Sequence, residues 1–440
     1  MISWRSCANM IAMPNHSQID QLEAQELSIA AATAFQPRAP ISTRELFAGR
    51  WEQLTTVADA VSQKGLHIII FGERGVGKTS LANIVGPLLY VMEESVTGKT
   101  PAPRLVVKVN THEGDSFQAL WRRAFDEVFV EENRPLFGLN PGKVTERNAL
   151  RESFGISNAP SIDEVRRALA RLKGSIFIFD EFDRGGKSLR TACTDLVKAL
   201  SDYAVESTVV IVGVSDTIDH LIRDHASIVR SIVQIQLPRM NERELRDILD
   251  KAAKALKIEF STAASSLIVR MSQGLPHYTH LIGLHATREA ANRRSRLIES
   301  EDVHRSFGKA VKQAVQSIQE KHLQAIHSAH REALYDKVLL ACACASSVAK
   351  DALGYFRPAD VVDPLAAILS RPSVTIATFQ KHMNEFCEAG RGPVFERAGV
   401  ARAYKYRFQD PLMPPYIFMT SVADGEIDVK KLRDLTVQDE

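Results

Sequence analysis

The chain has 440 residues, of which 45% are hydrophobic and 25% charged, a composition typical of a soluble globular protein with two or three domains. Its net charge of +2 is small, so binding to nucleic acid or anionic membranes would need a local basic patch. The five cysteines contain no CxxC pair, which argues against a disulfide framework and structural zinc. The apolar runs are too short to span a membrane, and no signal peptide is recognisable. We therefore expect a cytoplasmic protein without a membrane partner.

Residues 1–40 are polar and weakly patterned, which is typical of a flexible N-terminal arm, and we expect no chemistry there. Beyond them, short runs of Val, Ile and Phe alternate with helical patterns. The runs are residues 66–71, 104–110, 175–180, 208–214 and 232–237. Because they lack polar alternation, they predict strands buried on both faces, in a parallel sheet covered by helices.

The stretch DSFQALWRRAFDEV, residues 115–128, carries an apolar stripe at helical spacing and is predicted to be a crossover helix with Asp115 as its N-cap. The following stretch, from about 132 to 160, is rich in Asn, Pro and Gly. We interpret it as an insertion before the third strand.

Residues 240 to about 330 show only helical patterns, with expected N-caps at Asn241 and Ser261 and a break at GLP, residues 274–276. A long polar-faced helix is expected at about 305–330. It leads to the apolar helix YDKVLLACA, the helices RPADVVDPLAAIL and TIATFQKHMNEF, and the strand pair PVFER and AYKYRF. Three helices followed by a two-stranded ribbon is the order of a winged helix.

The sequence FGERGVGKTS follows the first strand and satisfies the pattern GxxxxGKT with Gly72, Gly75, Gly77, Lys78 and Thr79. The glycines let backbone N–H groups curl around phosphates, the lysine reaches the β and γ oxygens, and the threonine hydroxyl binds Mg²⁺. The helix that follows adds its positive N-terminal dipole. This loop predicts a nucleotide triphosphate site.

The sequence IFIFDEFD places Asp180 and Glu181 at the end of the third strand. There Asp180 can hold Mg²⁺ through water, and Glu181 can polarise the attacking water. The alternative is a solvated acidic turn, since Asp183 and Arg184 follow.

Two weaker signals come from later strands. GVSD puts Ser215 and Asp216 at the end of the fourth strand, where a polar side chain can sense the γ-phosphate. Arg230, just before the fifth strand, could enter a neighbouring subunit's site and neutralise charge in the transition state. Arg223 competes for that role, and an ordinary surface arginine is the alternative for both.

Together these motifs resemble the AAA+ ATPases, in the branch of origin-recognition and replication-initiator ATPases and the related transposition ATPases. LFAGR followed by WEQL is similar to that branch's adenine-packing motif, GERGVGKTS to its Walker A, IFIFDEFD to its Walker B and GVSD to its sensor 1. The resemblance covers residues 45–300 and extends more loosely to a winged helix at 330–420. It implies ATP and Mg²⁺ as cofactors, ATP hydrolysis and a homo-oligomer.

The resemblance also assigns residues. Those expected at the nucleotide are Gly72, Glu73, Arg74, Gly75, Val76, Gly77, Lys78, Thr79, Ser80 and Arg50, and those expected at the metal are Thr79 and Asp180. The chain departs from the family at GLPHYTH, where sensor 2 commonly has an arginine and this chain has His277. Arg288, on the helix that follows, about three turns on, is a candidate substitute. A neutral imidazole is no permanent cation, so lid closure on ATP is in question.

The predicted fold is therefore α/β, a P-loop NTPase with a parallel sheet, a helical lid and a C-terminal winged helix. The expected domains are a flexible arm (1–40), an AAA+ core (41–239), a helical lid (240–305), a linker helix (306–330), the winged helix (331–420) and a tail (421–440).

The last predicted strands and the helix before them carry a basic cluster. Its candidate DNA contacts are Lys381, Arg397, Arg402, Lys405 and Arg407. They would bind phosphates, with the tyrosines of AYKYRF available for stacking. The alternative is that Tyr404, Tyr406 and Phe408 form the core of the unit, leave the basic residues as a solvated face, and make the winged helix a protein-binding surface.

Two functions stay open from the sequence. In the first, ATP assembles an oligomer on DNA and hydrolysis resets it. In the second, the chain resembles regulatory signalling ATPases, and its nucleotide state controls a separate effector protein that docks on the winged helix.

Overall fold

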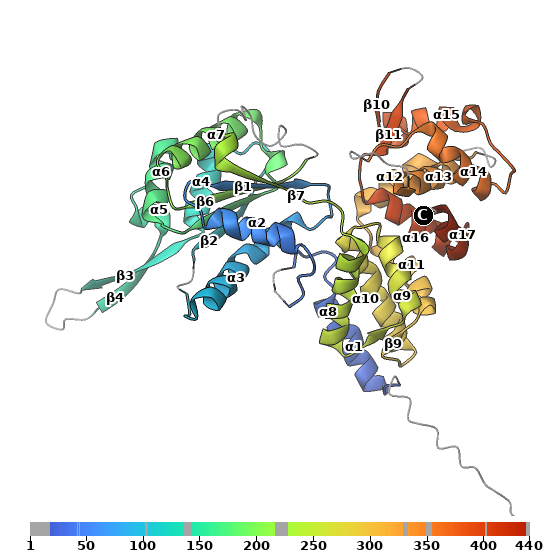
Figure 1. Ribbon diagram of the computed structural model, residues 1–440, viewed down its shortest axis with the longest axis horizontal. Coiled ribbons are helices and arrows are strands. Elements are labelled where there is room, and N and C mark those ends of the chain that lie inside the picture. Colours follow the sequence, from blue (N-terminus) through green and yellow to red (C-terminus); the bar gives the residue numbers. More distant parts are fainter. Residues whose placement is uncertain are drawn as a thin grey trace, which may run out of the picture.

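The computed structural model describes residues 18–41, 43, 45–101, 104–135, 143–215, 228–328, 333–348, 354–400 and 403–436. An α/β core, a helical unit and a C-terminal unit with a two-stranded ribbon follow one another along the chain (Figure 1). In the described part of the chain, none of the helices combines the length and the apolar character needed to cross a membrane.

The core is built on a five-stranded sheet with the order β2-β5-β6-β1-β7, in which all neighbours run parallel. Its strands are β1 (His67–Gly72), β2 (Val106–Asn110), β5 (Ile176–Asp180), β6 (Thr208–Val214) and β7 (Ile232–Gln236). Each overlaps a strand predicted from the sequence, and the predicted P-loop sheet is confirmed. Because the strands are parallel, the loops after β1, β5 and β6 all lie at one edge of the sheet.

Helices cover both faces of this sheet, and each face has its own apolar cluster. On one face α2 (Trp51–Val61) and α3 (Lys78–Thr97) pack with Ile68 and Ile70 of β1. On the other face the helices pack against Phe177 and Phe179 of β5. These helices are α4 (Phe117–Asp126), α6 (Ile162–Arg171) and α7 (Lys187–Asp202).

The predicted N-cap of α4 is wrong by one residue. The Ser116 hydroxyl accepts the cap hydrogen bond from the Ala119 N–H at 3.1 Å. Asp115 instead forms an ion pair with Arg123 at 2.6 Å and accepts from the His112 N–H. The Arg123 guanidinium, on the last turn of the same helix, competes for the Asp115 carboxylate, so the cap falls to Ser116.

The stretch interpreted as an insertion contains an antiparallel hairpin of β3 (Phe129–Pro135) and β4 (Lys143–Ala149), followed by the short helix α5 (Leu150–Ser153). The hairpin projects from the core at the lower left of Figure 1. It starts at Phe129, a few residues before the insertion that we predicted.

The helical unit follows β7. Its elements are α8 (Glu242–Leu256), β8 (Glu259–Phe260), α9 (Thr262–Ser272), α10 (Pro276–Asn292), β9 (Leu297–Ile298) and α11 (Ser300–Gln313). The expected N-caps hold: Asn241 and Ser261 accept from Glu244 N and Ala264 N. The predicted break at GLP separates α9 from α10.

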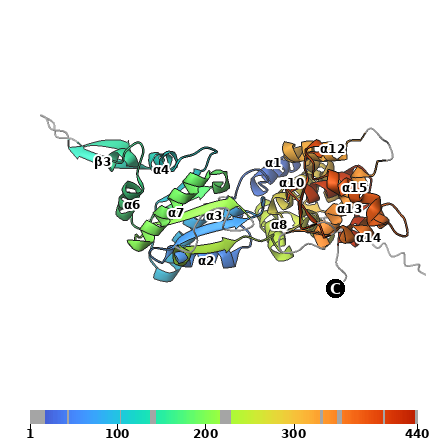
Figure 2. The same ribbon diagram turned by 90° about the horizontal axis from the view of Figure 1, so that it is seen from above.

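The N-terminal region is no loose arm where the structure describes it. Residues Gln21–Ala34 form α1, which a capping box between Asp20 and Glu23 starts. Leu27 and Ala31 are buried, and α1 packs on α8 and α10 of the helical unit, as Figures 1 and 2 both show. The prediction failed because the buried face of α1 consists largely of small alanines, which carry little hydrophobic patterning.

The C-terminal unit, defined as the described residues from 316 on, starts where the expected linker helix breaks in two at residues 314–315. Its elements are α12 (Gln316–Ile326), α13 (Tyr335–Val348), η5 (Pro358–Val361), α14 (Val362–Ile368), α15 (Ile376–Glu385), η6 (Ala389–Arg391), β10 (Phe395–Ala398), β11 (Lys405–Phe408), α16 (Met413–Ala423) and α17 (Val429–Thr436). The order of helices and ribbon is the one we predicted. The winged-helix assignment itself stays a prediction.

Helices α16 and α17 differ from the expected tail at residues 421–440. Helix α17 packs against α13 and buries Leu432. Helix α16 is buried along most of its length and contacts both α11 of the helical unit and α13. The end of the described chain is thus part of the core that joins the two units.

Candidate nucleotide-binding site

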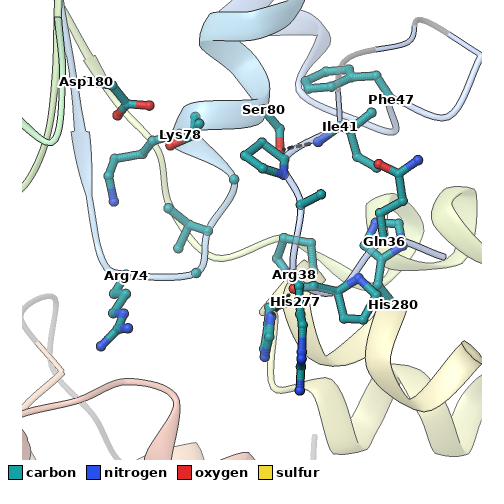
Figure 3. A pocket seen from close by; sticks show the side chains of 18 of the residues that line it. Gln36, Arg38, Ile41, Phe47, Arg74, Lys78, Ser80, Asp180, His277 and His280 are labelled. Carbon is teal, nitrogen blue, oxygen red and sulfur yellow. Dashed lines mark hydrogen bonds between the residues drawn. The ribbon is translucent and has the colours of Figure 1, made fainter. Parts of the chain in front are cut away.

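A cavity of about 700 Å³ lies where the P-loop, the helical unit and residues 36–41 meet. In Figure 3, Lys78 and Asp180 of the core lie on one side of it, and His277 and His280 of the helical unit on another. The polar end is formed by the P-loop and the acidic turn after β5. Apolar side chains line the other end, among them Ile41, Phe47, Met240 and Ile248. A cavity of this volume, with one polar and one apolar end, suits a nucleotide.

Lys78 is buried at the start of α3, and its ammonium donates to the carbonyls of Gly72 at 3.0 Å and Glu73 at 2.7 Å. Burial lowers the pKa of Lys78 to about 8, against an opposing effect of Asp183 and Asp180. The lysine therefore rests on the P-loop backbone, where phosphate oxygens could replace the two carbonyls.

Two P-loop glycines need their conformational freedom. Gly75 and Gly77 have φ angles of +86° and +98°, in the region that favours glycine. At Gly75 space is also short, because a Cβ there would lie 2.9 Å from Cδ2 of Leu412 in the C-terminal unit. Val76, between them, is fully buried and anchors the loop.

Asp180 ends β5 and is buried, as the predicted metal ligand should be. Its Oδ2 lies 3.0 Å from the ammonium of Lys108 on β2, which also donates to Asn83 at 2.8 Å. Sequence reasoning missed Lys108. The only signal was a lysine in an otherwise apolar strand, VVKVN.

The residues present fit a magnesium ion bound together with a nucleotide. Asp180 and Thr79 line the same cavity and offer oxygen ligands, which Mg²⁺ prefers. Among the described residues, no group of three or more His, Cys, Asp or Glu side chains could hold a metal. An ion here would therefore depend on phosphates and water for its other ligands.

Glu181 follows in a left-handed backbone conformation, with φ +52°, which is unusual for a non-glycine residue. Its carboxylate is half exposed and pairs with Arg184 at 2.8 Å. Asp183 points back to the sheet and accepts from the Val214 N–H at 2.8 Å, which fixes the turn. Glu181 therefore fits both interpretations of this turn, because it lines the cavity and also forms an ion pair at the surface.

The weaker sequence candidates are placed apart. Ser215 is buried at the end of β6 and lines a second, smaller cavity next to the first. Arg230 is exposed in the turn η4 (Val229–Ser231) before β7. Asp216 and Arg223 lie outside the described residues.

Arg50 holds the core and the helical unit together. It is buried with φ +63°, its guanidinium donates to the carbonyls of Val76 at 3.1 Å and Pro238 at 2.6 Å, and its backbone N–H donates to Glu244. Burial lowers its pKa, and Glu244 partly offsets this. Arg50 lines the cavity, but two of its donors are spent on carbonyls that fix the P-loop.

Sequence reasoning missed residues 36–41, which include the QPRAP stretch and line the cavity. The Ile41 N–H donates to the Ser80 hydroxyl at 3.1 Å, drawn as a dashed line in Figure 3. At the other end, Nδ1 of His277 is 2.7 Å from the Pro37 carbonyl. The segment is thus tied both to the P-loop helix and to the helical unit.

His277 lines the cavity, and burial lowers its pKa, so it is neutral at pH 7. The candidate substitute Arg288 is not at the site, because its Nε donates to the Ser28 carbonyl of α1. Arg38 and Arg74 line the cavity as well as His277, together with Arg50, Lys78 and Arg184.

Nucleotide affinity is expected to fall as the pH rises above about 8. In the empty cavity Lys78 has a pKa of about 8, and bound phosphates would raise it, so binding above pH 8 must take up a proton. The loss approaches tenfold per pH unit. Fluorescence titration with ADP between pH 7.5 and 9.5 measures it, and Lys78→Arg is the control, since its charge persists. A flat wild-type profile would contradict the assignment.

The basic residues predicted to contact DNA differ in how they are held. Lys381 is 81% exposed, with Glu385 at 3.6 Å, and Arg397 is exposed with its guanidinium 4.5 Å from the Tyr404 ring. Lys405 is exposed on β11. Arg402 lies outside the described residues.

Arg407 points elsewhere. It pairs with Glu396 at 2.8 Å, lies over the Tyr355 ring and lines the second cavity beside the P-loop. Of the three residues in the core alternative, Tyr406 is fully buried and Phe408 nearly so, as predicted, but Tyr404 is only half-buried.

Solved structures similar to this chain are distant. The ORC1 protein of Aeropyrum pernix, solved in complex with DNA, is 14% identical, with a TM-score of 0.45 over 89% of this chain and 96% of that chain. The Cdc6p protein of Pyrobaculum aerophilum is 16% identical, with a TM-score of 0.42 over 93% and 99%. The RuvB Holliday junction branch migration motor of Thermotoga maritima is 14% identical, with a TM-score of 0.39 over 83% and 94%. Likenesses this distant assign no function.

No curated protein matches the chain. The model of the family described as Novel STAND NTPase 1 matches residues 34–351, well over half of the chain. With the sheet order and the P-loop geometry, this match confirms the predicted P-loop NTPase. The matched range includes the cavity-lining segment 36–41, the P-loop and the acidic turn after β5. The chain belongs to the Novel STAND NTPase 1 family.

Proposed function

We propose that the chain binds and hydrolyses ATP with Mg²⁺ and that its nucleotide state controls how the C-terminal unit docks on the P-loop. One observation carries this proposal: the P-loop lines the nucleotide cavity and also contacts the C-terminal unit directly. Residues 41–239 would then be the ATPase core, 240–305 the lid and 331–420 a winged helix that responds to the nucleotide.

The contact involves the turn that leads into α16. Asp410 lies 3.1 Å from the guanidinium of Arg74 in the P-loop, and Leu412 approaches Gly75. The Tyr278 hydroxyl of α10 donates to the Leu412 carbonyl at 2.6 Å. Core, helical unit and C-terminal unit therefore meet at one turn beside the phosphate site.

The chemistry follows from how the side chains are held. Lys78 would exchange two backbone carbonyls for phosphate oxygens, and Asp180 and Thr79 would ligate the ion that supplies Lewis-acid stabilisation of the phosphates. Glu181 would leave Arg184 and accept a proton from the attacking water. Arg230, exposed in the turn before β7, would complete the site of a neighbouring copy in a homo-oligomer.

Asp410→Asn tests the docking. The variant keeps the side-chain size and loses the charge that faces Arg74, so the turn at residues 409–414 should exchange backbone hydrogen a few-fold faster. Hydrogen exchange of the full chain with ADP, with a nonhydrolysable ATP analogue and without nucleotide measures this. Asp434→Asn, on the exposed face of α17, is the matched control. Equal exchange of 409–414 in all three wild-type states would rule out nucleotide control of the contact.

A second candidate function is DNA engagement by the C-terminal unit. The observation that favours it is the exposure of Lys381, Arg397 and Lys405 on α15 and the ribbon. Against it, Arg407 is committed within the fold, and the amides of Gln380 and Asn384 on α15 hold the Tyr406 hydroxyl. If this surface does not bind DNA, a separate effector protein is the alternative partner.

DNA binding is expected to weaken about tenfold in Arg397→Ala with Lys405→Ala, because two phosphate contacts are lost. Fluorescence anisotropy over a salt series, with ATP, ADP or no nucleotide, measures the affinity. Lys430→Ala, an exposed cation on α17, serves as the control. If the wild type binds no DNA in any nucleotide state, a protein partner is the better interpretation of this surface.

A further inference from the structure

A second cavity, of about 370 Å³, separates the phosphate side of the core from the C-terminal unit. The core supplies the loop after β1, the end of β6 and α7, and the C-terminal unit supplies the end of β11 and the turn into α16. Four arginines line this cavity: Arg74, Arg190, Arg239 and Arg407. No motif in the sequence singled out Arg190 or Arg239.

Three of these arginines have carboxylate partners. Arg74 pairs with Asp410 at 3.1 Å, Arg239 with Glu73 at 2.7 Å and Arg407 with Glu396 at 2.8 Å. Their charges are largely neutralised where they stand.

Arg190 differs from them. Among the described residues, the one hydrogen bond of its side chain runs from Nη2 to the Asp183 carbonyl at 2.9 Å, and the guanidinium has no ion pair. Its Nε is buried without a partner. A guanidinium has five N–H donors, so most of the donors of Arg190 are unused beside a cavity. A half-buried cation with unused donors is suited to a bidentate oxyanion.

The cavity adjoins the nucleotide site. Arg74, Asp183 and Val214 line both cavities, and Ser215, at the end of β6, lines the second. The shared residues come from the P-loop, the turn after β5 and the end of β6, which together form the phosphate end of the site. Arg190 thus lines a cavity that shares part of its wall with the phosphate end of the nucleotide site.

We propose that this cavity is a phosphate-binding chamber in which Arg190 holds a phosphate oxyanion, either the terminal phosphate of the bound nucleotide or inorganic phosphate. The inference rests on the proposed function and deepens it. Because Arg407 and Gln409 form the opposite wall, a phosphate in the chamber would contact both the core and the C-terminal unit. The turn of Asp410 would then sense whether the phosphate is present.

The test uses the full chain and three probes: inorganic phosphate, ADP and a nonhydrolysable ATP analogue. Isothermal titration measures each affinity for wild type, Arg190→Gln and Arg190→Lys. Lys198→Gln is the matched control, an exposed cation further along α7. Loss of the guanidinium should weaken phosphate binding on the order of tenfold, and lysine should restore part of it, because it keeps the charge but not the fork.

The two sources of phosphate give different results. If the terminal phosphate occupies the chamber, Arg190→Gln lowers the affinity for the ATP analogue and leaves that for ADP unchanged. If inorganic phosphate does, wild type binds it alone or with ADP, and Arg190→Gln binds it on the order of tenfold more weakly. The proposal is overturned if all three affinities match those of Lys198→Gln. Failure of the wild type to bind either nucleotide would instead refute the proposed function, and the phosphate titration would still test the chamber.

Discussion

Replacing Lys78 with alanine should abolish nucleotide binding and leave the protein folded. The ammonium is the one side-chain cation at the start of the P-loop helix, and it would make two charge-assisted hydrogen bonds to phosphate oxygens. Their loss should weaken ADP and ATP binding on the order of 100-fold or more. Fluorescence titration with both nucleotides gives the affinities.

The structure also predicts how Lys78→Ala changes the thermal stability of the protein. Lys78 is a buried cation whose pKa is lowered to about 8 by burial, so its charged form is costly in the empty protein. Alanine removes that cost, and the melting temperature without nucleotide should stay the same or rise. Lys64→Ala, a cation with 65% exposure near β1, is the control and should bind nucleotide normally. If Lys78→Ala kept its affinity for nucleotide, the P-loop would not be the phosphate-binding site.

The core sheet could be predicted because its signals are local. Runs such as IFIFD are apolar on both faces, which is typical of buried parallel strands, and the GxxxxGKT pattern fixes the turn between β1 and α3. The side chains of Lys78, Thr79 and Asp180 then meet at one sheet edge by topology alone. Their convergence on one cavity was readable from the sequence.

The other walls of the site could not be predicted, because they depend on contacts between distant segments. Residues 36–41 look like a linker, and only the hydrogen bond from Ile41 to Ser80 and the contact of Pro37 with His277 bring them to the cavity. Arg50 looks like an adenine-site residue, yet its guanidinium is used to hold two backbone carbonyls. Partner choice among polar groups is decided by tertiary structure.

The same holds for the basic residues of the ribbon. A count of charges put Arg407 with Arg397 and Lys405 in one DNA-binding patch. In the structure Arg407 pairs with Glu396 on the neighbouring strand and lines the cavity beside the P-loop, whereas Arg397 lies against the Tyr404 ring. Residues close in sequence thus serve different surfaces, which supports a role of this unit in reading the nucleotide.

Glu181→Gln should bind nucleotide within a few-fold of wild type but turn it over 100- to 10,000-fold more slowly, on the order expected for loss of a general base. Glutamine keeps the shape and the left-handed backbone of the turn, so the fold should not change. Phosphate release measures turnover, and the affinities measure binding. Unchanged turnover would show that Glu181 is not the general base.

The pair with Arg184 provides the companion experiment. Both side chains are 51% exposed, and such surface pairs hold weakly. Glu181 can therefore leave its partner readily, and Arg184→Ala should change turnover less than about fivefold.

If Arg230 acts on a neighbouring copy, mixing the inactive Glu181→Gln and Arg230→Ala variants should restore part of the activity, because some interfaces then combine an intact Glu181 with an intact Arg230. Activity strictly proportional to protein concentration, without such rescue, would mean that each copy hydrolyses nucleotide alone and that the switch lies wholly within one chain.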